Sequence, residues 1–175
     1  MKQLIILESS LNPKSKSKVL AQEAKQTLEA NHQDLEVKLL NIGDYKLPIC
    51  DGSTVYSDPN VQKLGKELQS ASAILIATPI YNYTINSNLK NAIECTGRDA
   101  WSDKVVGFLV AAGGQGSYMA IMGIANSLML DFRCLIVPRF VYALSQDVEN
   151  GAVVSDDVRE RIKQLTEKTV QLAQL

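Results

Sequence analysis

Short apolar runs alternate along the chain with longer stretches whose apolar residues recur at helical spacing. The runs at residues 3–7, 35–40, 73–78, 105–111 and 134–138 predict five strands. The run at 73–78 is aliphatic throughout, and Pro79 is expected to end it. Runs that are apolar on both faces are typical of parallel sheets covered on both sides.

The intervening stretches predict helices over residues 18–30, 59–71, 117–131 and 155–175, and another that starts near Ser87. Asp58 and Ser155 are expected to cap the helices that follow them, and Ser117 can cap the helix at 117–131. Strands that alternate with helices predict an α/β three-layer sandwich with right-handed crossovers. Five strands favour the sheet order 2-1-3-4-5, and without a repeat or linker the chain is expected to form a single domain, residues 1–175.

In such a sheet, ligands bind beyond the carboxyl ends of the strands, where the strand order reverses. The loops after the first, third and fourth predicted strands should therefore share a site. The first of these loops reads ESSLNPKSKSK, residues 8–18, and leads into a helix. Its hydroxyls, its lysines and the helix N-terminus suit a phosphate monoester. The same residues also suit a polar helix cap, and the loop lacks the glycine motifs of nucleotide and dinucleotide sites.

The other two loops contain groups that suit a planar heterocycle. The loop after the third strand offers the aromatic faces of Tyr81 and Tyr83 and the amide of Asn82. The loop after the fourth strand, AAGGQGSY at 111–118, has three glycines that allow a planar ligand to approach the backbone. Exposed tyrosines and a tight turn are the simpler alternatives for each loop taken alone.

Composition excludes several function classes. A net charge of -1 gives no basic field for nucleic acid or an anionic membrane. The first apolar run is too short for a secretion signal or a membrane span, so we expect a cytoplasmic protein. Three scattered cysteines and the single His32 form no metal-ligand set, so free thiols and a surface histidine are expected. Trp101 is expected in the core or at a subunit interface.

Three segments resemble the NADPH-dependent FMN reductase family, a flavodoxin-like group that includes azo-, quinone- and chromate-reducing enzymes. TPIYNYTINSNLKNAIE at 78–94 is similar to the family's TPxYNxSxPxxLKNAID segment. SSLNPKSKSKVLA at 9–21 resembles its phosphate loop, and AGGQGSYMA at 112–120 resembles its second flavin-contacting loop. Ser9 stands where many members have glycine, and Asn86-Ser87 replaces the usual Pro-Gly, so we expect a changed pocket mouth and weaker FMN retention.

The resemblance implies that residues from all three loops bind FMN, and it implies no catalytic side chain and no metal. The residues implied to hold the phosphate are Ser10, Ser15 and Ser17. Those implied to line the isoalloxazine ring are Pro79, Ile80, Tyr81 and Asn82 on one edge and Gly113, Gly114, Gln115 and Gly116 on the other.

The implied function is an NAD(P)H-dependent oxidoreductase. NADPH or NADH would reduce FMN, which would pass two electrons to a small acceptor: a free flavin, a quinone, an azo compound or a metal oxyanion. A homodimer or homotetramer is implied as well. A non-catalytic FMN-binding electron carrier and a flavin-dependent sensor remain as alternatives. An α/β hydrolase is excluded by the lack of G-x-S-x-G and of a usable histidine.

Overall fold

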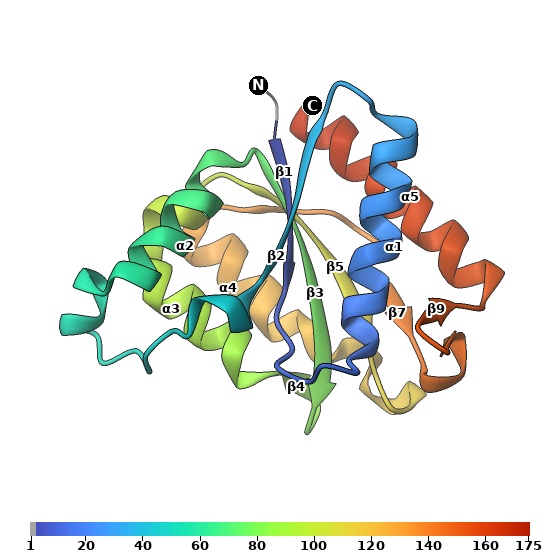
Figure 1. Cartoon of the computed structure of the whole chain (residues 1–175), viewed down its shortest axis with the longest axis horizontal. Coiled ribbons are helices and arrows are strands. Elements are labelled where there is room, and N and C mark those ends of the chain that lie inside the picture. The colour runs from blue at the N-terminus through green and yellow to red at the C-terminus, as the bar shows by residue number, and fades with distance from the viewer. Residues whose placement is uncertain (1–2) are drawn as a thin grey trace.

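A parallel sheet forms the centre of the computed structural model, which describes residues 3–175 (Figure 1). Its long strands are β1 (Gln3–Glu8), β2 (Glu36–Asn41), β3 (Ala73–Tyr81) and β5 (Val105–Ala111). The fifth position holds two short strands, β6 (Leu135–Ile136) and β7 (Val141–Ala143), both parallel to β5. The order is β2-β1-β3-β5-β6. The short strand β4 (Thr84–Ile85) is antiparallel and pairs only with β3. When β4 is left out of the numbering, the parallel strands follow the predicted order 2-1-3-4-5.

Five α-helices cover the two faces of the sheet and complete the predicted three-layer sandwich (Figure 1). One face carries α1 (Lys16–Asn31) and α5 (Asp156–Ala173). The other carries α2 (Pro59–Ser70), α3 (Ser87–Trp101) and α4 (Met122–Phe132). Successive residues of each strand point to opposite faces, so Ile74 packs on the α2–α4 side and Leu75 on the α1–α5 side. Trp101 is fully buried in the first of these cores, which confirms core packing.

Pro79 does not end the third strand, contrary to the prediction. β3 continues to Tyr81, with Pro79 opposite Ala111 of β5. The pairing of β3 with β1 ends at Ala77, whose carbonyl accepts from the N–H of Ser9. Backbone N–H groups point alternately to the two sides of a strand. At Pro79 the N–H would point to the side on which β1 has already ended, so its absence removes no hydrogen bond between strands.

The predicted strand at 134–138 and helix at 117–131 are both interrupted. Pro138 and the left-handed Arg139 (φ 61°) separate β6 from β7. The α-helix begins only at Met122, because residues Gln115–Ile121 form a 3₁₀ segment. Ser117 does not cap it; its hydroxyl hydrogen-bonds to Tyr142 Oη at 2.8 Å.

Helix caps elsewhere follow the prediction. Asp58 accepts from the N–H groups of Asn60 and Val61, and Ser155 accepts from Val158. A hairpin of β8 (Val148–Glu149) and β9 (Ala152–Val153) was not predicted, although its turn is Asn150-Gly151, the sequence that type I′ hairpins prefer. Within residues 3–175, none of the helices has the length and apolarity needed to cross a membrane.

Candidate functional site

The three predicted loops lie at one edge of the sheet, beyond the carboxyl ends of β1, β3 and β5. In Figure 1 they form the lower rim of the molecule: the blue loop before α1, the green tip at β4 and the yellow turn after β5. This edge is the one at which strand order reverses between β1 and β3.

The loop between β1 and α1 folds its hydroxyls inward around Glu8. Ser10, Ser15 and Ser17 are all buried. The Ser10 N–H and the Ser17 hydroxyl donate to Glu8 Oε1 at 2.9 and 3.1 Å, and Ser15 Oγ lies 2.7 Å from Ser17 Oγ. Ser15 precedes α1 without making a side-chain capping bond to it. The three serines implied to hold a phosphate are therefore neighbours, at the start of a helix.

Glu8 is the group that sequence reasoning missed in this loop. It is the last residue of β1 and is 1% exposed, and its Oε2 atom is buried without a hydrogen-bond partner among the described residues. Burial raises the pKa of this carboxyl, against the lowering effect of the bonds from Ser10 and Ser17. An acidic residue inside a serine-rich loop was visible in the sequence, but its inward orientation was not.

The loop after β3 is a two-residue hairpin turn. Asn82 (φ 50°) and Tyr83 (φ 62°) are both left-handed, and Tyr81 faces Thr84 across the turn. Two successive positive φ angles are typical of a type I′ turn, and a tyrosine held there is conformationally strained. Tyr81 and Tyr83 are 51% and 73% exposed, whereas Pro79 is buried and Ile80 is half-buried. The strained turn therefore presents two aromatic rings at the rim.

The glycine turn after β5 leaves open backbone beside that hairpin. Gly113, Gly114, Gln115 and Gly116 are all exposed, and a Cβ added at Gly113 or Gly114 would meet nothing within 4 Å. A Cβ at Gly116 would lie 3.5 Å from Tyr83 Oη. The glycine turn and the hairpin thus lie against each other, with free space over the glycines.

Ser9 and Asn86, the two departures from the family pattern, are hydrogen-bonded to each other. Asn86 is 2% exposed; its Nδ2 donates to the Ser9 carbonyl at 2.7 Å, and its Oδ1 accepts from Ser9 Oγ at 3.0 Å and Thr78 Oγ1 at 3.3 Å. This cluster ties the loop between β1 and α1 to the start of α3. It replaces a capping bond, since Asn86 precedes α3 without capping it.

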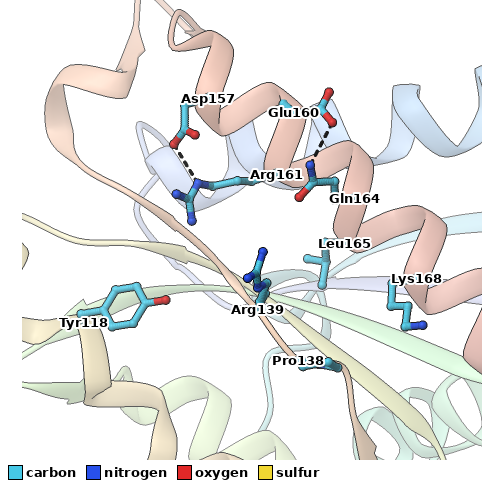
Figure 2. Close-up of a pocket in the computed structure, with 9 residues that line it drawn as sticks. All are labelled: Tyr118, Pro138, Arg139, Asp157, Glu160, Arg161, Gln164, Leu165 and Lys168. Atoms are coloured by element: carbon cyan, nitrogen blue, oxygen red, sulfur yellow. Dashed lines mark hydrogen bonds and ion pairs between the residues drawn. The ribbon is translucent and has the colours of Figure 1, made fainter.

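Cavities adjoin the loops of the site, and Tyr81 and Asn82 of the hairpin themselves line one of them. One of about 570 Å³ runs behind the hairpin, between residues 81–90 and α4. Another of about 580 Å³ lies between α5 and residues 138–139, beneath the Arg161–Asp157 ion pair (Figure 2). Figure 2 shows Tyr118, which follows the glycine turn, at the margin of this second cavity. The second cavity therefore lies next to the predicted flavin edge but is built mainly from α5.

The remaining candidates lie away from the three loops. Cys50, Cys95 and Cys134 are free, and burial raises the pKa of the Cys95 and Cys134 thiols to about 11. His32 follows α1 at the opposite end of that helix and is half-buried rather than fully at the surface. Among residues 3–175, no three His, Cys, Asp or Glu side chains gather as a metal site would require.

FMN fits these residues on one condition. The open backbone at Gly113 and Gly114 leaves room for a flat ring, and the serines at the start of α1 can donate to a phosphate. A charged Glu8 would repel that phosphate, so the fit requires its carboxyl to be neutral, the form that burial favours.

Comparison with known proteins shows which family the chain resembles. A model of the family described as NADPH-dependent FMN reductase matches residues 1–149. The NAD(P)H-dependent FAD/FMN reductase of Geobacillus thermodenitrificans is 30% identical over 141 residues, covering 79% of this chain and 76% of the relative. The quinone reductase of Pseudomonas putida is 28% identical over 132 residues, covering 71% of each chain.

The solved structure of a flavoenzyme NAD(P)H:(acceptor) oxidoreductase from Paracoccus denitrificans has the same fold. Its TM-score is 0.81 at 21% identity, and the match covers 99% of this chain and 98% of that one. The chain therefore belongs to the NADPH-dependent FMN reductase family, and it is an NAD(P)H-dependent oxidoreductase with FMN as cofactor and a flavodoxin-like fold.

Proposed function

We propose that this chain holds FMN across its three rim loops and passes electrons from NADPH or NADH to a small acceptor. A free flavin, a quinone, an azo compound and a metal oxyanion are the candidate acceptors. The observation that supports this best is the meeting of a buried serine cluster, a strained aromatic hairpin and an open glycine turn at the switch point of the sheet. These are the parts that a phosphate and a flat ring need, at the place where this fold binds ligands.

The residues of the chain bind and orient, and the cofactor supplies the redox chemistry. The chemistry that FMN would supply when bound is two-electron transfer, from a nicotinamide hydride to the acceptor. Ser10, Ser15 and Ser17 hold the phosphate in this proposal. Residues 79–82 and 113–116 hold the ring, largely through backbone groups.

The exposure of the rim favours two successive half-reactions. Tyr81, Tyr83 and the glycine turn are open to solvent, so donor and acceptor can reach the same ring in turn. This arrangement supports ping-pong kinetics, in which the oxidised nicotinamide leaves before the acceptor binds.

A homodimer or homotetramer in the cytoplasm belongs to the same proposal. Apolar side chains stand exposed along the segment that leads into and forms α4, among them Met119 at 62% and Leu130 at 85%. Exposed apolar patches mark association surfaces. The free thiols suit a reducing compartment.

Flavin titration followed by turnover tests the proposal. The purified protein should quench FMN fluorescence at micromolar FMN. With FMN not in excess over the protein and oxygen removed, it should then oxidise NADPH or NADH continuously once a quinone or azo acceptor is added. FMN binding without turnover would instead identify an electron carrier or a sensor. Failure to bind any flavin would refute the proposed function.

Replacing Ser15 and Ser17 by alanine tests the phosphate loop. Each change removes a hydroxyl donor to an anionic group, which is worth about 1.5–3 kcal/mol, so the FMN Kd should rise at least about tenfold. Ser57→Ala is the matched control, since Ser57 is exposed in the 3₁₀ turn just before α2, and it should leave the Kd of FMN unchanged. Unchanged affinity in Ser15→Ala and Ser17→Ala would show that the phosphate lies elsewhere.

A further inference from the structure

Glu8 ends β1, and its carboxyl accepts hydrogen bonds from the loop proposed to hold the phosphate. Its Oε1 already takes the Ser10 N–H and the Ser17 hydroxyl, two of the donors that a phosphate would need. Its Oε2 is buried and unpartnered among the described residues. A buried carboxylate oxygen without a donor is costly, whereas a protonated carboxyl carries a hydroxyl that can itself donate to an anion.

The surroundings of Glu8 contain little to hold its charge. Lys18 of α1 favours the ionised form, and Asp44 in the 3₁₀ turn after β2 opposes it. The strand neighbours of Glu8 are uncharged: Asn41 on β2 and Ala77 on β3. Lys18 and Asp44 therefore act on the pKa of Glu8 in opposite directions, and burial has the largest effect on it.

We propose that Glu8 determines which flavin this chain holds. With its carboxyl protonated, the loop accepts the phosphate of FMN and Glu8 adds a donor to it. With its carboxyl ionised, the loop rejects the phosphate dianion and admits only a flavin without one, riboflavin. FMN binding above the pKa of Glu8 thus takes up one proton. This inference rests on the proposed function, since it assumes that the flavin lies across the three loops.

Paired titrations with FMN and riboflavin, followed by flavin fluorescence between about pH 6 and pH 8, test it. In the wild type the FMN Kd should rise by up to about tenfold per pH unit, because one proton is coupled to binding. The riboflavin Kd should stay flat. In Glu8→Gln the FMN Kd should lose this dependence and be lower than that of the wild type at the upper pH.

Two controls isolate Glu8. The phosphate of FMN itself titrates near pH 6, but it does so equally in the wild type and in Glu8→Gln, so the comparison between them removes it. Glu167→Gln removes an exposed carboxyl from α5 and should bind like the wild type. If Glu8→Gln does not fold, Glu8→Ala takes its place, and calorimetry in buffers of different ionisation enthalpy should count about one proton more taken up with FMN by the wild type than by that variant, and none by either with riboflavin.

The outcomes separate this inference from the proposed function. Tight FMN binding that has the same pH profile in the wild type and in Glu8→Gln would overturn the role of Glu8 and leave the function standing. The absence of proton uptake in wild-type calorimetry would overturn it in the same way. Failure of every variant to bind either flavin at any pH would refute the proposed function itself.

Discussion

At the residue scale, the site depends on a polar cluster that no single loop reveals. Asn86 makes three hydrogen bonds, two to Ser9 and one to Thr78, and all three residues are buried. Each alone looks like an ordinary polar residue beside a turn. Together they join the loop between β1 and α1 to the start of α3.

A double-mutant cycle measures that match. Ser9→Ala and Asn86→Ala should each lower the free energy of unfolding by about 1–3 kcal/mol, since buried partners are left unsatisfied. The double variant should lose about 1 kcal/mol less than the sum, measured by urea unfolding. Asn91, also on α3, bonds the backbone of Cys50 and Pro48, so pairing Asn91→Ala with Ser9→Ala is the control and should be additive. Additivity in the Ser9–Asn86 pair would contradict the coupling.

Glu8 also predicts a pH dependence of stability in the flavin-free protein. Its folded pKa lies above the unfolded value, so the stability it contributes is complete below the unfolded pKa and is lost as pH rises through the folded pKa. In that window the wild type should lose up to about 1.4 kcal/mol per pH unit relative to Glu8→Gln. Parallel stability curves for the two proteins in urea unfolding between about pH 4 and pH 7 would contradict this.

At the element scale, side chains from β3 and α5 fill the space over one position of β5. A Cβ at Gly107 would lie 2.7 Å from Leu75 Cδ2 and 3.1 Å from Leu165 Cδ1, both in the core between the sheet and α5. The glycine is thus required by packing, although its φ angle is not in the left-handed region.

Gly107→Ala should therefore destabilise the protein by about 1–3 kcal/mol through overpacking. Gly123→Ala is the matched control: it lies in α4, and its Cβ would meet nothing within 4 Å. Helix propensity predicts that this control is neutral or stabilising by up to about 1 kcal/mol. Thermal unfolding followed by circular dichroism compares the two, and equal effects would show that α5 shifts freely on the sheet.

At the scale of the whole molecule, the sandwich is a rigid base from which three loops project at one rim (Figure 1). The sheet buries an apolar core on each face, whereas the rim exposes two tyrosines, one of them in a strained turn, and open glycine backbone. A ligand that bridges the three loops would therefore connect β1, β3 and β5, and its binding would stabilise the complete fold against unfolding.

FMN should raise the melting temperature by an amount that grows with the logarithm of its concentration above the Kd. At about a hundred times its Kd, a ligand that binds only the folded state adds about 2.7 kcal/mol. For a chain of this size the corresponding rise is about 5–11 °C. Differential scanning fluorimetry measures it, with Ser17→Ala giving a smaller rise at equal FMN. A melting temperature independent of FMN would mean that the loops do not bind it.

The sequence by itself determined the parallel sheet, its strand order, the helix caps at Asp58 and Ser155, and the three loops that form the candidate site. These features follow from local periodicity and local hydrogen bonding, which are written in contiguous residues. Local rules were wrong at Pro79, where the end of the neighbouring strand decides whether the missing N–H matters, and at 134–138, where Pro138 interrupts a run that reads as continuous.

The tertiary structure alone decided how the loops are joined. The Ser9–Asn86 bonds, the contact of Tyr83 with Gly116 and the inward carboxyl of Glu8 connect residues that are distant in sequence or hidden by the fold. No periodicity encodes such contacts, because they depend on which strands become neighbours and on how deeply a side chain is then buried. The sequence pointed to a flavin site, and the fold placed a buried acid among the serines that we propose bind the phosphate of that flavin.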